Sequence, residues 1–476
     1  WAGYSWTMPH YVSSEELNMV FHKIERVHFV GIGGIGMSGI AEVLINLGFK
    51  VTGSDVRRTD ITERLASLGA VIFKGHREEN IIDSDVVVVS SAVKPNNPEV
   101  KKARELFIPV IQRAEMLAEL MRMKYSIAVA GAHGKTTTTS LVSSILGHAG
   151  LDPTCVIGGR LNSLGSNAKL GDSKFLVAEA DESDGTFLLL FPTIAVATNI
   201  DLEHLDFYKD IKEIKAAFLA FLNKVPFYGV NILCIDNANI QSLIPSLKRR
   251  YMTYGLSKQA DLRADNISYE GFVTKFKVIY KGYDLGEIKL NLAGTHNVVN
   301  ALAACGVAIE LDIPFHTIQE ALKSFSGIHR RLEIKYDGDI KLIDDYGHHP
   351  TEVKATLSAM RKMWQGRIIV AFQPHRYTRT QGLMDDFASS FNEADVLIVT
   401  EIYAASEDPI EGISGSSLAE KIRASGHKNV IFAPTRDDVV KRILENSKPG
   451  DVVITLGAGD LYKIDEKLRK AWTGKK

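Results

Sequence analysis

A glycine-rich turn followed by a lysine holds the residues best suited to chemistry in this chain. It comes directly after an apolar run, Ile127 to Ala130, and before a helical pattern, Thr136 to Leu146. A strand, a glycine turn and the start of a helix direct several backbone N–H groups at one point, and such a point attracts phosphate. The residues of this phosphate loop are Gly131, Ala132, His133, Gly134, Lys135, Thr136 and Thr137.

Lys135 supplies a full positive charge where the β- and γ-phosphates of a nucleotide would lie, and Thr136 supplies a hydroxyl for Mg²⁺. The loop is shorter than the common G-x-x-x-x-G-K-[ST] pattern, because the first glycine of that pattern would fall on Val129. A tight turn with an exposed lysine is the alternative. The sequence favours a phosphate loop, since Gly-Lys-Thr directly after an apolar strand is uncommon without a phosphate to bind.

Carboxylates follow the next apolar strand, which we predict from Phe175 to Ala178. They are Glu179, Asp181, Glu182 and Asp184. Because Mg²⁺ takes hard oxygen ligands, carboxylates beside a phosphate loop predict a magnesium site; a solvated acidic turn is the alternative. The strand from Ile194 to Thr198 leads to His204 among further acids, and this imidazole could bind a second metal ion.

A second glycine motif lies near the start of the chain. The strand Val27 to Val30 is followed by G-x-G-x-x-G and a helix, which is the dinucleotide-binding fingerprint. Asp55 follows the next strand, Lys50 to Ser54, where an acid that binds ribose is expected. Taken alone, the pattern predicts NAD, although any pyrophosphate can bind at such a helix N-terminus. The residues of this fingerprint loop and its helix are Gly31, Gly33, Gly34, Gly36 and Ser38.

Two further strands, Val71 to Phe73 and Val86 to Val89, predict an N-terminal Rossmann-like domain that ends near Lys124. His76 follows the first of these strands and Ser90 follows the second. Ligands bind at the carboxyl ends of strands in such sheets. His76 could therefore face a phosphate, or it could be an ordinary surface histidine.

The pattern changes in the middle of the chain. From Asn266 to Leu292, apolar residues alternate with lysines between glycine turns, which predicts antiparallel hairpins. An alanine-rich helix then starts after Gly294 and carries Asn297 and Asn300 on one face. Their amides could bind an adenine edge, whereas helix capping is the simpler role for Asn297.

Beyond Ile328 the sequence predicts a second doubly wound α/β unit. Its strands are Ile340 to Ile343, Ile368 to Phe372, Val396 to Val399, Val430 to Phe432 and Val452 to Leu456. His375, Arg376 and Arg379 follow the second strand. A guanidinium can donate two hydrogen bonds to one carboxylate, so these residues predict a carboxylate clamp; solvated arginines on a loop are the alternative.

Bulk composition sets the class of protein. A chain of 476 residues is too long for one core and predicts about three domains. With 45% hydrophobic residues and a net charge of −1, it is typical of a soluble globular protein, and nucleic acid or a membrane surface is disfavoured as its main partner. The three cysteines stand far apart in apolar contexts, which favours thiols in a reducing compartment and predicts the cytoplasm.

Taken together, these motifs resemble the Mur ligase family from about Arg26 to Leu468. The G-x-x-G-K-T-T loop, Glu179, the segments 199–204 and 294–300, and Arg331 are similar to the ATP-binding signature of that family. The resemblance implies an α/β fold of three domains. Residues 23–124 would be an N-terminal Rossmann-like UDP-sugar-binding domain, and residues 125–327 a central P-loop ATPase-like α/β domain with an antiparallel extension. Residues 328–476 would be a C-terminal Rossmann-like amino-acid-binding domain, and residues 1–22 an extension or a cloning-derived segment.

Three segments narrow the resemblance: residues 31–41, Asp-Asp-Tyr-Gly-His-His-Pro-Thr-Glu at 344–352, and Gln-Pro-His-Arg-Tyr-Thr-Arg-Thr at 373–380. They are similar to members of the family that act on L-alanine. The implied activity is an ATP-dependent ligation of L-alanine to the lactoyl carboxylate of UDP-N-acetylmuramate through an acyl phosphate, in peptidoglycan precursor synthesis. ATP and two Mg²⁺ ions are the implied cofactors, with no nucleic acid and no membrane insertion.

The resemblance also implies roles for single residues. The fingerprint loop would hold the UDP pyrophosphate instead of NAD, with Asp55, His76 and Ser90 as further UDP contacts. Besides the phosphate loop, the implied ATP contacts are Asn297, Asn300, Arg331 and Asp345. The implied metal ligands are Thr136, Glu179 and His204, and the implied catalytic residues are Lys135, Glu179, His204 and Arg331. The implied amino-acid contacts are Tyr346, His348, His375, Arg376 and Arg379.

One departure is Leu202-Glu203-His204, where relatives usually have Asp-His. Three alternatives stay open. A related ligase would attach a whole peptide to the same sugar nucleotide, which the stretch 375–379 disfavours. An NAD-dependent dehydrogenase would explain the fingerprint loop but would leave Lys135, Glu179 and His204 without a role. A nucleotide-gated binding protein would keep the phosphate loop without needing the clamp.

Overall fold

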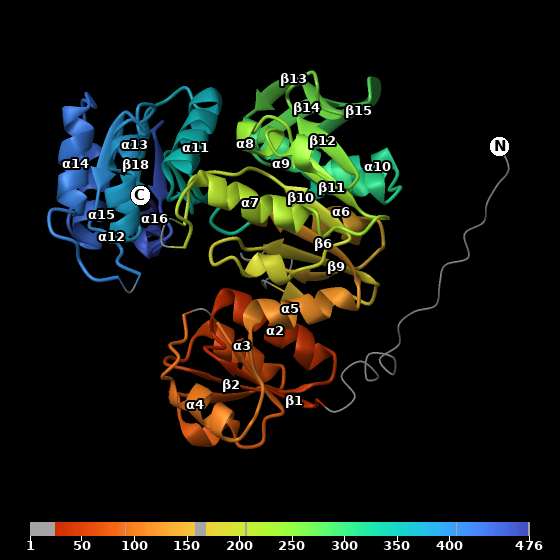
Figure 1. Ribbon diagram of the computed structural model, residues 1–476. Coiled ribbons are helices and arrows are strands. Elements are labelled where there is room, and N and C mark those ends of the chain that lie inside the picture. Colours follow the sequence, from red (N-terminus) through yellow and green to blue (C-terminus); the bar gives the residue numbers. More distant parts are fainter. Residues whose placement is uncertain (1–23, 91, 158–167, 205–206, 406, 475–476) are drawn as a thin grey trace. The chain divides into compact units, whose positions relative to one another are not determined.

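The computed structural model describes residues 24–90, 92–157, 168–204, 207–405 and 407–474, and the predicted segment 1–22 lies outside them. Three sheets organise the described chain (Figure 1). Contacts between residues divide the chain into two compact units. The first extends to Asp265 and takes in Val278–Gly286 and Val299–Phe325, and the second consists of Asn266–Lys277, Glu287–Val298 and the chain from Ser326 onward. The three-domain α/β fold is confirmed, whereas the domain bounds stay a prediction.

The first sheet has the strand order β3-β2-β1-β4-β5, and all its neighbours are parallel. The order reverses between β1 and β4, which is where ligands bind in such sheets. Helices α2 and α3 pack on each other (Figure 1), and η1 packs on α4. The elements are β1 (Arg26–Val30), α2 (Ile35–Asn46), β2 (Lys50–Asp55), α3 (Asp60–Ser67), β3 (Val71–Lys74), η1 (Glu78–Ile81), β4 (Val86–Val89), α4 (Pro98–Glu105), β5 (Val110–Gln112) and α5 (Arg113–Arg122).

The second sheet has ten strands in the order β15-β14-β13-β12-β11-β10-β6-β9-β7-β8. Its strands are β6 (Tyr125–Ala130), β7 (Thr154–Val156), β8 (Ala168–Lys169), β9 (Phe175–Ala180), β10 (Ile194–Ala197), β11 (Val230–Cys234), β12 (Tyr251–Gly255), β13 (Leu262–Glu270), β14 (Val273–Tyr280) and β15 (Tyr283–Leu290). The helices are α6 (Lys135–His148), η2 (Thr186–Leu189), α7 (Ile211–Leu222), α8 (Ala238–Gln241), η3 (Ile244–Ser246), α9 (Thr295–Glu310) and α10 (Phe315–Ser324).

The central strands of this sheet are apolar because both of their faces are covered. Every residue of β10 and β11 is buried, as expected for parallel strands between two layers. Two-residue connections join β13 to β14 and β14 to β15, and such short connections join antiparallel strands. The predicted hairpins are therefore present. Strand β9 is longer than predicted, because its ladder with β6 continues through Glu179 and Ala180.

The third sheet has the order β16-β17-β21-β18-β19-β20, with β16 as its antiparallel edge. One face packs Phe372, Phe387 and Phe391 into a core, and the other packs Leu342 and Ile369. The strands are β16 (Glu333–Asp337), β17 (Lys341–Asp345), β18 (Ile368–Phe372), β19 (Val396–Val399), β20 (Val430–Phe432) and β21 (Val452–Leu456). The helices are α11 (Pro350–Met363), α12 (Tyr377–Gly382), α13 (Met384–Ala388), α14 (Gly415–Ala424), α15 (Arg436–Asn446), η4 (Leu461–Ile464) and α16 (Asp465–Thr473).

The cysteines and the lengths of the helices bear on the predictions made from composition. All three cysteines are buried free thiols, and burial raises the pKa of Cys155 and Cys234 to about 11. Within the described ranges, each helix is too short or too polar to pass through a lipid bilayer.

Candidate functional site

The phosphate loop between β6 and α6 depends on glycine. Gly134 precedes α6 with a φ of +83°, and a Cβ at this position would lie 2.5 Å from Asn300 Oδ1. Only glycine fits such a left-handed and crowded position. Helix α6 begins without a side-chain cap. Its first N–H groups and its dipole therefore favour an anion, which fits the predicted nucleotide phosphate.

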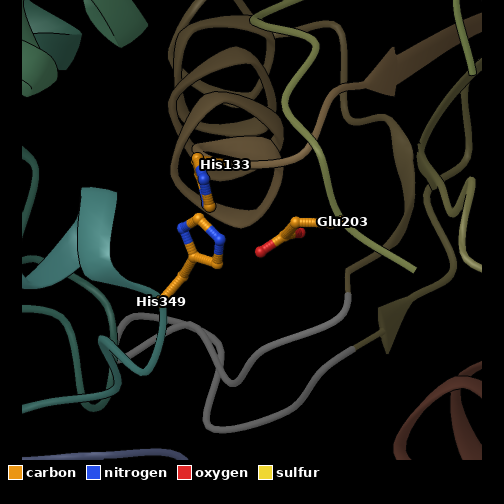
Figure 2. Close-up of side chains that lie close together, drawn as sticks. All are labelled: His133, Glu203 and His349. Carbon is orange, nitrogen blue, oxygen red and sulfur yellow. The ribbon is translucent and has the colours of Figure 1, made fainter. Parts of the chain in front are cut away.

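Asn199, on the segment after β10, fixes the loop from the side. Its Oδ1 accepts from the backbone N–H of His133 at 2.8 Å, and its Nδ2 donates to the His133 carbonyl at 2.9 Å. The Thr198 hydroxyl donates to the same carbonyl at 2.6 Å. Figure 2 shows His133 just before α6 and Glu203 on the segment that follows β10. This role of Asn199 could not be predicted from the sequence, because its partner His133 lies far away along the chain.

Lys135 forms a buried ion pair with Glu182. Its Nζ lies 2.9 Å and 3.0 Å from the two carboxylate oxygens and also donates to the Gly131 carbonyl at 2.6 Å. The two side chains are 15% and 3% exposed. Burial by itself lowers the pKa of Lys135, but the carboxylates of Glu182, Asp181 and Glu203 raise it above its usual value. Sequence reasoning named Glu182 only as one acid among several, since no local pattern separates it from Glu179.

A candidate metal-binding group consists of Glu182, Glu203 and His204, whose ligand atoms lie within 4.8 Å of one another. His204 Nε2 is 3.7 Å from an oxygen of each glutamate. Of the predicted ligands, His204 belongs to this group, whereas Glu179 lies opposite Val129 in the β6–β9 ladder and Thr136 lies in the first turn of α6. Two carboxylates suit a hard divalent cation, so these residues fit the predicted magnesium.

The fingerprint loop is held at the carboxyl edge of the first sheet. The Gly33 N–H donates to Asp55 Oδ2 at 2.9 Å, and the Gly31 N–H donates to the Ser54 carbonyl at 2.8 Å. Gly34 caps α2 without a side-chain bond, and its carbonyl accepts from the N–H of the buried Ser38. Asp55 therefore binds the loop itself, and its ribose contact stays a prediction.

Three residues flank this loop. His76 follows β3 and Ser90 follows β4, so the structure brings both to the edge where they were predicted. The third is Arg113, to which no sequence motif points; it begins α5, and its Nη1 would lie 3.0 Å from a Cβ placed on Gly36. Its position is set by tertiary packing, so no local pattern reveals it.

The predicted ATP contacts outside the phosphate loop have structural partners. Asn300 Oδ1 accepts from the Thr138 hydroxyl at 3.4 Å, and Asn297 Nδ2 donates to the Ala293 carbonyl at 2.7 Å. Asp345 is buried and accepts from the backbone N–H groups of Leu332 and Gly347. Arg331 lies 3.5 Å from Glu352. Their roles toward adenine, ribose and phosphate stay predictions.

The carboxyl edge of the third sheet gathers most of the predicted amino-acid contacts. His348 lies with its ring 5.5 Å from that of Tyr346 and 5.8 Å from that of His375, and His375 stacks on Tyr403. Arg379 Nη1 lies 3.1 Å from His375 Nδ1. Burial, with the Arg379 charge nearby, lowers the pKa of His348 to about 3 and that of His375 to about 4.

Arg376 and Arg330 complete this edge. Arg376 lies just before α12 and 3.9 Å from Glu407. Arg330, for which the sequence predicts no role, donates from Nε to Asp344 at 2.9 Å and from Nη2 to the Gly457 carbonyl at 2.5 Å. Its guanidinium also lies 4.4 Å from the Tyr462 ring centroid. A positive φ of 61° at Arg330 distinguishes it in the structure but leaves no signal in the sequence.

Family comparisons agree with this architecture. Three family models match the chain in order: the Mur ligase family catalytic domain over residues 26–125, the Mur ligase middle domain over 129–308, and the Mur ligase glutamate ligase domain over 330–459. The chain belongs to the Mur ligase family.

Single relatives cover nearly the whole chain. A UDP-N-acetylmuramate–L-alanine ligase of Geotalea uraniireducens is 60% identical over 450 residues, covering 94% of this chain and 98% of that protein. The crystal structure of a UDP-N-acetylmuramate–alanine ligase from Thermotoga maritima has a TM-score of 0.81 and 30% identity, with 95% and 100% of the two chains covered. A murein peptide ligase from Psychrobacter arcticus has a TM-score of 0.69 and 26% identity, with 94% and 98% covered.

The ion pair predicts a stability cost for losing Lys135. Lys135→Ala leaves the Glu182 carboxylate buried without its counter-ion, so the free energy of unfolding should fall by about 3 kcal/mol. Adding Glu182→Gln should recover most of this loss, because the buried charge is then gone. Urea denaturation of the wild type, both single variants and the double variant measures these differences. Equal stability of Lys135→Ala and the wild type would show that the pair is not formed.

The lowered histidine pKa values predict a pH-dependent stability. His348 and His375 are neutral in the folded chain down to about pH 4, whereas in the unfolded chain they bind protons below about pH 6.5. The unfolded state therefore takes up more protons, and stability is lost as the pH falls from about 6.5 to 4. His348→Gln should reduce this slope by up to about 1.4 kcal/mol per pH unit. Denaturant titrations at pH 4, 5, 6 and 7 test it, and identical slopes would contradict it.

Proposed function

We propose that this chain is an ATP-dependent ligase that joins L-alanine to the lactoyl carboxylate of UDP-N-acetylmuramate through an acyl phosphate. The observation that carries the proposal is the 60% identity, over 94% of the chain, to a relative of that name. Three separate sites support the proposal, because each offers contacts suited to a different substrate: the phosphate loop, the fingerprint loop and the residues around His375.

The first step activates a carboxylate, which is a poor acyl donor at neutral pH. A lactoyl oxygen attacks the γ-phosphorus of ATP, ADP leaves, and an acyl phosphate forms. The N–H groups of the first turn of α6 and the Lys135 ammonium would hold the phosphates. A Mg²⁺ ion, bound through Glu182, Glu203 or His204, would supply further positive charge to the transferring group. Lys135 must exchange Glu182 for a phosphate oxygen to act in this step.

The second step forms the amide. The alanine amine attacks the acyl carbonyl, inorganic phosphate leaves with the electrons of the C–O bond, and the amine gives up a proton. Arg379 would bind the alanine carboxylate through its guanidinium. The low pKa values keep His348 and His375 neutral at physiological pH, so these two rings add no positive charge beside an incoming ammonium group.

Binding of the sugar nucleotide would use the fingerprint loop, with its uncapped helix α2 directed at the pyrophosphate. ATP as a substrate and three buried thiols both fit the reducing interior of a cell, so we place the reaction in the cytoplasm. The peptidoglycan role follows from the same substrates.

Release of phosphate tests the function and its rivals together. With ATP and Mg²⁺, phosphate release should require both UDP-N-acetylmuramate and L-alanine, and mass spectrometry should find UDP-N-acetylmuramoyl-L-alanine. Replacing L-alanine with a tripeptide should abolish release. Efficient use of the tripeptide instead of L-alanine would favour a peptide ligase. Tight NADH binding without binding of the sugar nucleotide would favour a dehydrogenase.

The amino-acid site is tested with Arg379→Lys. Lysine keeps the charge but loses the planar fork, so the KM for L-alanine should rise at least about tenfold, while the KM values for ATP and UDP-N-acetylmuramate change little. Arg367→Lys is the matched control. Arg367 lies just before β18, at the opposite end of the strand from Arg379, and its guanidinium lies 3.7 Å from Asp451. A change confined to the KM for ATP would move Arg379 to the phosphate side.

A further inference from the structure

A cluster of buried polar groups lies under the edge of the first sheet and has no role in the steps above. At its centre is Glu99, in the first turn of α4, whose side chain is 0% exposed. Its Oε2 accepts from the Ser54 hydroxyl at 2.6 Å and lies 3.1 Å from His76 Nδ1. Its Oε1 accepts from Asn80 Nδ2 at 2.6 Å. Burying a carboxylate costs free energy unless hydrogen-bond donors satisfy it. The positions of these donors are therefore constrained by Glu99.

The donors keep Glu99 ionised. Burial by itself would raise the pKa of Glu99, but the neighbouring His28 ring, whose Nε2 lies 3.7 Å away, and the hydrogen bonds from Ser54 and Asn80 hold it below its usual value. An ionised carboxylate can only accept hydrogen bonds. Asn80 also donates to the Gly75 carbonyl at 3.1 Å, so the same cluster fixes the turn that carries His76.

These contacts determine the tautomer of His76. The single proton of the Ser54 hydroxyl lies on its 2.6 Å bond to Glu99, so toward His76 Nδ1, 2.8 Å away, Ser54 can only accept. Both neighbours of Nδ1 are therefore acceptors, and Nδ1 must carry the hydrogen. In the neutral ring this leaves Nε2 as an acceptor.

The exposed part of His76 lies where a ligand is expected. Its side chain is 22% exposed, and it follows β3 at the carboxyl edge that also holds the fingerprint loop. A diphosphate offers only acceptors, whereas a nucleoside offers ribose hydroxyls and a base imide N–H as donors. An accepting Nε2 therefore matches the nucleoside and not the diphosphate.

We propose that Glu99 is a positioning residue for nucleotide binding, which together with Ser54 fixes His76 as the Nδ1–H tautomer so that Nε2 accepts a hydrogen bond from the nucleoside of the UDP sugar. This inference rests on the proposed function, because it needs a UDP sugar at this edge. Glu99 itself does not touch the ligand.

Glu99→Gln tests the proposal. Asn80 needs an acceptor, so the glutamine oxygen should face Asn80 and its amide NH₂ should face Ser54 and His76. A donor at Nδ1 forces the hydrogen to Nε2, which can then no longer accept. The Kd for UDP-N-acetylmuramate, measured by calorimetry, should rise about tenfold, while kcat at saturation and the Kd for ATP change less than about twofold.

Glu42→Gln is the matched control, because Glu42 is another buried carboxylate of this sheet's helices and pairs with Arg64. It should leave the Kd unchanged. In a His76→Ala background, Glu99→Gln should cause no further loss of affinity. A purely structural role of Glu99 would instead weaken binding by the same factor with and without His76, and that result would overturn the proposal.

Nitrogen NMR of the imidazole reads the tautomer directly, with His76→Gln identifying the signal. The wild type should show the Nδ1–H form and Glu99→Gln the Nε2–H form. An Nε2–H form in the wild type overturns the proposal even if Glu99→Gln does not fold. Failure of the wild type to bind UDP-N-acetylmuramate at all would instead overturn the proposed function.

Discussion

An ion pair between two buried charges sets the geometry of the phosphate loop. In a poorly hydrated interior, either Lys135 or Glu182 alone would be costly, so each keeps the other in place. The same ammonium binds the Gly131 carbonyl, which ties the start of the loop to its end. The loop is therefore shaped before a nucleotide arrives. Glu182 both keeps the lysine charged and restrains it, because a phosphate oxygen must compete with a carboxylate that is already bound.

Parallel strands explain why the three predicted binding sites each lie at the carboxyl edge of their own sheet. All strands of a parallel sheet present their carboxyl ends at one edge, so the segments that follow them set the function. Gly31, Gly134 and Gly457 each stand in such a segment with a positive φ. A Cβ on Gly457 would lie 2.6 Å from the Gln373 carbonyl, so at this position, too, the backbone approaches too closely for a side chain.

The sequence predicts elements better than it predicts partners. Strands such as β10 and β18 are continuous apolar runs of Ile, Val, Ala and Phe, a pattern typical of strands that are buried on both faces of a parallel sheet. The two glycine loops could also be predicted, because residues that are adjacent in the sequence determine them. Glu182 and Asn199 could not be assigned, because their contacts join segments far apart in the sequence. The ends of β9 and β17 were missed for the same reason: the neighbouring strand supplies the ladder that extends them over Glu179 and Asp345.

The same kind of acid–base pair occurs at each of the three sheets. Glu99, Glu182 and Asp344 are buried acids, and each is bonded to a basic side chain near a carboxyl edge: His76, Lys135 and Arg330. A bare carboxylate there would repel the anionic substrates of a ligase. For Glu182 and Asp344, the charge of the paired lysine or arginine largely cancels that of the carboxylate at the distance of a ligand. Glu99 faces a neutral His76 ring, and hydrogen bonds from Ser54 and Asn80 satisfy this carboxylate instead. In all three places, hydrogen bonds fix the direction of the basic group. The acids therefore contribute orientation more than affinity, and an amide replacement changes the hydrogen-bond pattern while it leaves the shape of the site almost unaltered.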